Sequence, residues 1–148
     1  MSLRRLHAAE WVVAAGAVAL GVAMFLPWYE ARELRLNAWQ AFHIIDFFLV
    51  LAVLLGLALV GLTLIEARPG IPVGVAVFCA LAGPLALVLV AYRILDPTAI
   101  SVVHSADHTS VETDVERGLG AWLGLAGALL LTAGAWWSMR DERERGSH

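Results

Sequence analysis

The chain has 148 residues and a formal net charge of −3; 60% of its residues are hydrophobic and only 16% are charged. Soluble domains average about half apolar and about a quarter charged residues, so this composition argues against a water-soluble globular protein. No run of basic residues is long enough to indicate nucleic-acid binding. The single cysteine, Cys79, excludes an internal disulfide and any Cys-x-x-Cys redox or zinc motif.

Four apolar stretches follow one another along the chain, at residues 9–28, 44–65, 71–92 and 118–137. Each has about 20 residues, and a helix of that length, at about 1.5 Å per residue, crosses the roughly 30 Å hydrocarbon core of a bilayer. The sequence therefore predicts an all-α membrane protein, a single domain over residues 1–145 with four transmembrane helices in an antiparallel bundle. Residues 146–148 resemble the start of an expression tag and are set aside.

The first apolar stretch follows Arg4 and Arg5 and could be mistaken for a signal peptide. Its apolar run is longer than the usual core of a signal peptide, and no small-x-small cleavage site precedes a polar segment. It ends in Leu26-Pro27-Trp28-Tyr29, where a proline and two aromatic residues suit the end of a span. We interpret this stretch as a retained membrane anchor.

Aromatic residues stand near the expected span ends, as they do at membrane–water interfaces. The sequence places Trp11, Trp136 and Trp137 at one interface and Trp28, Tyr29, Trp39 and Tyr92 at the other. Of the ten arginines, six lie in the termini and the turn between the second and third spans, and four lie in the two other connections. By the positive-inside rule, both termini are predicted to be cytoplasmic, in a multi-pass protein of the plasma membrane.

Two long connections, residues 29–43 and 93–117, are then extracytoplasmic. In the first, Leu34 and Leu36 alternate with charged residues, which is the period of a half-buried strand. In the second, two β-branched runs flank a turn-forming segment, at residues 100–103, 111–115 and 105–108. We expect a small extracytoplasmic β-sheet, with one strand from the first connection and a hairpin from the second.

Several local patterns resemble small four-span membrane proteins encoded by high-GC Gram-positive bacteria. They are the segments Phe25-Leu26-Pro27-Trp28-Tyr29, Asn37-Ala38-Trp39-Gln40-Ala41-Phe42, Tyr92-Arg93-Ile94-Leu95-Asp96-Pro97 and Gly120-Ala121-Trp122-Leu123-Gly124. The resemblance touches all four spans and implies no activity. In shape the chain also resembles claudin-type proteins, whose four helices carry an outer sheet. Their Leu-Pro-x-Trp motif is here Leu26-Pro27-Trp28, and their loop disulfide has no counterpart, so the likeness is one of architecture.

One acidic residue lies inside an expected span. Asp46 stands in the first turn of the second span, just inside the outer boundary, where an ionisable group is costly unless it is paired or hydrated. Arg93 ends the third span at the same depth, and a tight turn joins these two spans. We favour a structural ion pair between Asp46 and Arg93, with a proton or ion site as the alternative.

The third span contains Gly83-Pro84 near its middle. A proline removes one helical hydrogen bond and can kink the helix, which leaves a free carbonyl near Ala80. Such kinks occur in transporters, but ordinary spans also tolerate proline, and this second interpretation is favoured.

Small residues recur every four positions in the first and last spans, at Ala15, Ala19 and Ala23 and at Gly120, Gly124 and Ala128. Such faces let two helices approach closely in a bilayer, and packing of the two spans within one chain is favoured over packing between chains. His104 and His108 have metal-binding side chains, but their surroundings indicate a solvated loop.

No catalytic triad, phosphate-binding loop or metalloprotease motif occurs in the sequence. We therefore expect a protein without enzymatic activity, metal or cofactor, which contacts membrane lipids and binds a membrane-protein partner or a second copy of itself. The alternative is a small oligomeric transporter or channel that uses Asp46 and the Pro84 kink.

Overall fold

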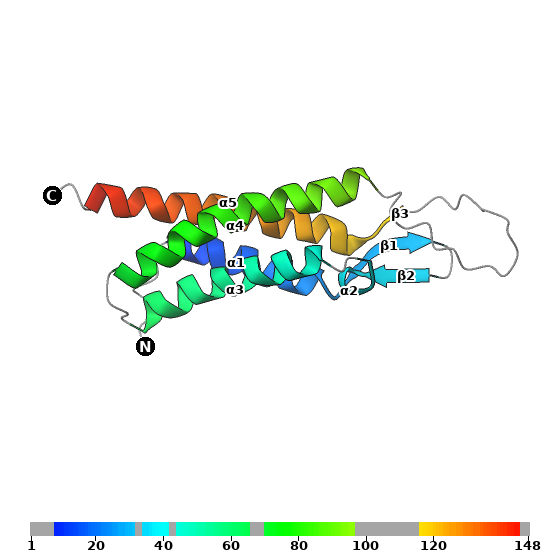
Figure 1. The fold of residues 1–148 in the computed structure, drawn as a ribbon, viewed down its shortest axis with the longest axis horizontal. Coiled ribbons are helices and arrows are strands. Elements are labelled where there is room, and N and C mark those ends of the chain that lie inside the picture. The colour runs from blue at the N-terminus through cyan, green and yellow to red at the C-terminus, as the bar shows by residue number, and fades with distance from the viewer. Residues whose placement is uncertain (1–7, 32–33, 42–43, 66–69, 97–115, 146–148) are drawn as a thin grey trace, which may run out of the picture.

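The structure is a computed structural model that describes residues 8–31, 34–41, 44–65, 70–96 and 116–145. It is mostly helical, with four long helices that form one bundle and a small sheet at one end of it, here called the sheet end (Figure 1). The four helices are α1 (Ala8–Ala23), α3 (Ile45–Leu64), α4 (Gly70–Leu95) and α5 (Leu119–Arg145), and α2 (Ala38–Ala41) is a single turn. The start of α1 and the end of α5 lie away from the sheet, at the far end (Figure 1).

Three of these helices, α3, α4 and α5, contain segments long and apolar enough to cross a membrane, and α1 is a shorter apolar helix of 16 residues. The expected spans at 44–65, 71–92 and 118–137 therefore correspond to helices. The first expected span, residues 9–28, is helical only to Ala23. Pro27 explains the early end, because proline disfavours helical backbone in the residue before it and lacks an N–H donor.

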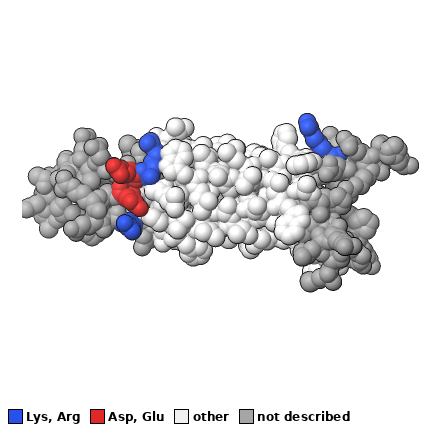
Figure 2. Space-filling view, turned by 180° about the vertical axis from the view of Figure 1, so that it is seen from behind, with Lys and Arg blue, Asp and Glu red and all other residues white. Residues whose placement is uncertain are grey.

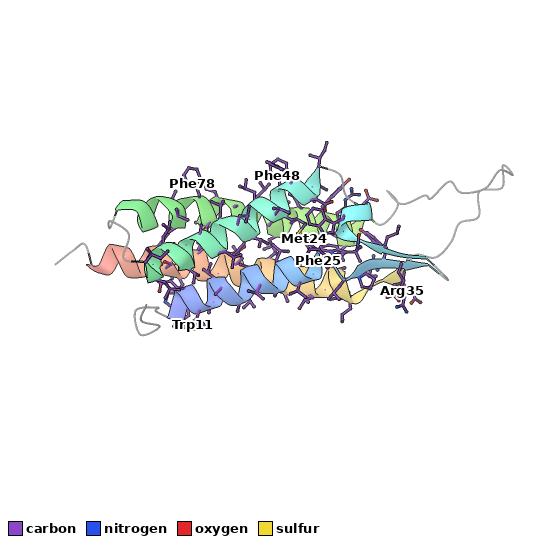
Figure 3. The ribbon with its side chains drawn as sticks, turned by 90° about the horizontal axis from the view of Figure 1, so that it is seen from below. Trp11, Met24, Phe25, Arg35, Phe48 and Phe78 are labelled. Carbon is purple, nitrogen blue, oxygen red and sulfur yellow. The ribbon has the colours of Figure 1, made fainter. Side chains whose placement is uncertain are left out.

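The helices form a ring in which α1 contacts α3 and α5, and α4 contacts the same two helices. The α1–α5 pair is antiparallel, because Gly134 of α5 lies against Val13 and Gly127 lies against Leu20. A core of apolar side chains from all four helices fills the middle of the ring, including Val13, Ala17, Leu20, Leu49, Leu59, Cys79, Val90 and Leu131. Met24, at the end of α1, also points into this core (Figure 3).

The sheet has three antiparallel strands in the order β2-β1-β3. They are β1 (Pro27–Ala31), β2 (Leu34–Asn37) and β3 (Glu116–Arg117). The first connection thus contributes a hairpin rather than the single expected strand, because Pro27 and Trp28, assigned to the end of the first span, join the start of the connection to form β1. The expected runs at 100–103 and 111–115 lie outside the described residues, and the second connection contributes β3.

The register of the sheet contains one irregularity. Pro27 pairs with Asn37 and Tyr29 with Leu36, so Trp28 is an extra residue of β1 at this point. An extra residue in one strand bends the strand and re-aims its side chain. Here it directs the Trp28 indole away from the ladder and into the end of the bundle, where it is fully buried.

Large apolar side chains cover the outside of the bundle. All four long helices expose them, among others Trp11, Val18, Phe47, Leu54, Phe78, Leu81, Val88, Leu129 and Leu130. Trp11 and Phe78 project outward from opposite sides of the ribbon (Figure 3). The visible face is uncharged along its middle, with acidic and basic groups gathered toward the sheet end and a basic group at the far end (Figure 2).

Candidate functional site

The junction between the sheet and the bundle contains most of the described polar side chains with specific partners, and Trp28 is its centre. The Trp28 indole N–H donates to the carbonyl of Ala23, at 2.7 Å, in the last turn of α1. The strand is also tied to the start of α5, because the N–H of Gly118 donates to the Trp28 carbonyl at 2.8 Å. These two bonds hold β1 between α1 and α5.

Two glycines of α5 make room for the Trp28 ring. A Cβ at Gly124 would lie 2.8 Å from both Cη2 and Cζ2 of the indole, and one at Gly120 would lie 2.9 Å from its Cδ1. Contacts under 3.0 Å require a shift of one of the two groups. Gly120 and Gly124, predicted as helix-packing residues, therefore accommodate a tryptophan from the strand, and Gly124 also faces helix α1 at Ala23.

Side chains from the sheet cap the end of α4. The last carbonyls of a helix have no partner within it, so they need donors from elsewhere. The Tyr29 hydroxyl donates to the carbonyl of Arg93 at 2.6 Å, and Nε of Arg117 donates to the carbonyl of Ile94 at 2.8 Å. The cation of Arg117 also suits the negative end of the helix dipole. Strands β1 and β3 are thereby fixed to α4.

Burial raises the pKa of the Tyr29 hydroxyl above its ordinary value, and Asp96 adds to this rise. The positive charges of Arg93 and Arg117 act in the opposite direction. The phenol therefore stays protonated at neutral pH and keeps its proton available for the carbonyl of Arg93. A phenol that stays protonated is suited to a structural role as a hydrogen-bond donor.

Asp46 and Arg93 occupy the positions that the sequence predicted for them. Asp46 lies in the first turn of α3 and is 5% exposed, and Arg93 lies in the last turn of α4. Both turns are at the sheet end, and α3 contacts α4. The N-terminal position of Asp46 also favours its negative charge through the helix dipole. The ion pair between the two side chains stays a prediction.

The exposed part of the junction is the β1–β2 hairpin. Glu30 and Arg35 are cross-strand partners in the register, with 4.0 Å between Arg35 Nε and Glu30 Oε1. The Arg35 side chain is 77% exposed and extends from the hairpin away from the bundle (Figure 3). An exposed ion pair of this kind contributes at most about 1 kcal/mol, so its position matters more than its energy.

The α1–α5 contact uses small residues that differ in part from the predicted ones. Ala23 and Ala128 are buried, but Ala15 is exposed and Ala19 is only half-buried. The face of α1 that meets α5 is instead centred on Gly16, whose added Cβ would overlap the backbone of Leu131. The prediction that Ala15 packs against α5 was therefore wrong, and the neighbouring residue Gly16 makes this contact instead.

The missed signal is a seven-residue spacing. Gly120, Gly127 and Gly134 recur at this interval in α5, and Ala9, Gly16 and Ala23 do so in α1. All six are buried. Residues seven apart stay on one side of two helices that wind around each other, so this interval marks a continuous seam. Four-residue steps drift off such a seam, which explains the error at Ala15.

The carbonyl freed by the helix proline has a partner. Pro84 lies inside α4, and the carbonyl four residues earlier belongs to Ala80. The indole N–H of Trp136, on α5, donates to this carbonyl at 3.2 Å. The sequence places Trp136 at a membrane interface, and the structure shows that it also joins two helices.

The remaining expected interface residues fall into two groups. Trp11, Trp39, Tyr92 and Trp137 are exposed near the ends of the bundle. Trp28 and Tyr29, by contrast, are 0% and 2% exposed. They are core residues of the junction, because they belong to strand β1, which packs between α1 and α5, and not to the exposed end of a helix.

Among the described residues, no group of three or more His, Cys, Asp or Glu side chains could hold a metal ion. His104 and His108 lie outside the described residues. No protein-family model matches the chain, and no curated protein matches it.

Proposed function

We propose that this chain is an integral membrane protein that crosses the bilayer four times and acts, without enzymatic activity, as a scaffold or accessory protein. Its sheet would face the extracytoplasmic side of the plasma membrane, with both termini in the cytoplasm. The sheet would bind a membrane-protein partner or a second copy of the chain. The observation that carries the proposal is the combination of an apolar outer surface with a packed interior.

The outer surface supports insertion into lipid. On the four long helices, the charged positions lie in the terminal turns or beyond the last span, at Glu10, Asp46, Arg93 and from Arg140 onward. The turns between them are uncharged and expose large apolar side chains. In water this surface would drive aggregation, whereas the hydrocarbon of a bilayer covers it at no cost.

The first helix is also compatible with a membrane span, although α1 is short. Its 16 residues extend about 24 Å at 1.5 Å per residue, which is less than the hydrocarbon thickness. The chain then continues through Met24 and Trp28, both buried. Non-helical backbone is tolerated at membrane depth where protein surrounds it. Here the N–H of Ala38 donates to the carbonyl of Met24 and the N–H of Gly118 donates to the carbonyl of Trp28, which meets that condition.

The packed interior favours a scaffold over a transporter. Among the described residues, the only buried polar or charged side chains other than aromatic ones and Cys79 are Asp46 and Ser138. Asp46 and Thr63 are 17 residues apart on α3, about 26 Å at 1.5 Å per residue, so the two do not form one local binding site. Thr63 donates to the carbonyl of Leu59 in its own helix. Pores need several polar groups that face inward along a path.

Photo-crosslinking in native membranes tests the scaffold. A photoreactive amino acid at Arg35 probes the exposed hairpin, and the same group at Phe78, which is 62% exposed, probes the apolar face of α4. We expect a discrete protein adduct from position 35 and lipid adducts from position 78. If neither position 35 nor position 30 gives a protein adduct, the sheet is not a docking surface.

A reporter that folds only outside the cytoplasm tests the orientation. Fused after residue 145, it is expected to be inactive, and activity would reverse the predicted topology. The transporter alternative rests on the buried carboxyl group of Asp46. Purified protein in liposomes should conduct no more protons or small cations than empty liposomes, and a flux abolished by Asp46→Asn would replace the scaffold with the transporter.

A further inference from the structure

Helix α4 is interrupted at Pro84, which divides it into a far segment, residues 74–83, and a sheet-side segment, residues 84–95. Proline cannot donate a hydrogen bond, and its ring strains the turn before it. The carbonyl of Ala80 therefore lacks its helical donor, and the indole N–H of Trp136 takes that place from α5. A bond that would normally stiffen one helix here joins two helices.

The sheet-side segment is held firmly at both of its ends. At the sheet end, Tyr29 and Arg117 donate to its last carbonyls. At the interruption itself, a Cβ at Gly83, the last residue of the far segment, would lie 3.0 Å from Cα of Thr132, so α4 and α5 are in close contact at this pivot point. Between these points the segment buries Ala86, Val90 and Ile94.

The far segment is held less firmly. Its fully buried side chains, those of Ala76, Cys79 and Ala80, are small; Val75 and Ala82 are partly buried against the core, while Val77 and Phe78 face outward. A Cβ at Gly74 would meet nothing within 4 Å. Small side chains gain little from packing, so the hydrogen bond from Trp136 to Ala80 adds measurably to what holds this segment against α5.

We propose that Trp136 is a latch on a hinge at Pro84. While the indole N–H is bonded to the Ala80 carbonyl, the far segment of α4 lies against α5. When the bond opens, the far segment moves away as a unit, and the sheet-side segment stays with the sheet. The device would let the far end of the bundle change shape while the sheet keeps its structure. It goes beyond the scaffold proposal and does not depend on it.

The native thiol provides a direct measurement. Cys79 is the only cysteine of the chain, it lies on the far segment one residue before Ala80, and it is fully buried. Its reaction with N-ethylmaleimide therefore requires the segment to open. When closing is faster than the reaction, the labelling rate follows the population of the open state. The full chain in lipid nanodiscs is suited to this assay.

Trp136→Phe removes the donor and keeps an aromatic ring. We expect it to raise the labelling rate of Cys79 about three- to fifteenfold, the range over which interhelical hydrogen bonds contribute in membrane proteins. Trp137→Phe is the matched control, since Trp137 is similarly exposed at the neighbouring position of the same helix. The ratio of the two rates cancels any general effect on insertion. A ratio of one would refute the latch.

Two further variants separate a hinge from general loosening. Tyr29→Phe weakens the junction at the sheet end and is expected to leave the Cys79 rate unchanged, and an equal rise would mean global opening instead of a hinge. Pro84→Ala restores the helical donor to the Ala80 carbonyl. In that background, Trp136→Phe should have no effect on labelling, and an undiminished effect would show that the hydrogen bond is not the latch.

Discussion

Replacing Gly127 by alanine tests the seam between α1 and α5. A Cβ at this position would lie 2.6 Å from the backbone N of Leu20 and 3.0 Å from the carbonyl O of Gly16. Both neighbours are backbone atoms of α1, so no side chain can rotate to relieve the overlap. Ordinary contact begins at 3.4 Å, and 3.4 − 2.6 = 0.8 Å is the shift that α1 must make.

A displacement of this size affects the whole seam. A gap of about 0.5–1 Å loses about a quarter to a half of the dispersion energy of each contact that it opens. Overpacking a well-filled site typically costs about 1–3 kcal/mol, while the better helix propensity of alanine returns about 1 kcal/mol at most. We therefore expect Gly127→Ala to lower the free energy of unfolding by about 1–3 kcal/mol.

Gly74→Ala is the matched control, because the same substitution in α4 meets nothing within 4 Å. It should be neutral or stabilise the protein by up to about 1 kcal/mol. Both values come from reversible unfolding in mixed micelles, followed by far-UV circular dichroism as sodium dodecyl sulfate is added. If Gly127→Ala is as stable as Gly74→Ala, the close approach of α1 and α5 is wrong.

Three further predictions concern the junction. Trp28→Phe should lower the free energy of unfolding by about 1–3 kcal/mol in the same assay, because it loses the bond to Ala23 and part of the ring that fills the α5 face. The raised pKa of Tyr29 stabilises the fold fully below the ordinary tyrosine pKa of about 10, and this contribution is lost as the pH rises through the folded-state value. Wild type should therefore lose stability above pH 10 in unfolding curves, whereas Tyr29→Phe should lack this step. Asp46→Ala and Arg93→Ala should each destabilise the protein, and together they should cost less than their sum; strict additivity would mean that the two side chains do not interact.

The helices could be predicted from the sequence because their cause is local. An uninterrupted run of about 20 apolar residues dictates a helix wherever backbone groups cannot bond to water, and three of the four predicted spans have matching helices. The presence of a small sheet was also predictable, from the alternation at Leu34 and Leu36. The division of strands was not, because Pro27 and Trp28 end an apolar run in the sequence but belong to β1, which pairs with β2 on one side and with β3 on the other.

The contacts of the junction were decided by tertiary structure. From the sequence, Trp28 is indistinguishable from a tryptophan at a membrane interface. It is buried because β1 has an extra residue at this point and because two glycines of α5 leave room for its ring. The sequence itself determined that Pro84 would free a carbonyl at Ala80, since that follows from the missing N–H. Which donor would meet the carbonyl depended on the rotation of α5 about its axis. That rotation is set by the glycine seam with α1, which brings Trp136 to α4 from 56 residues away in the chain.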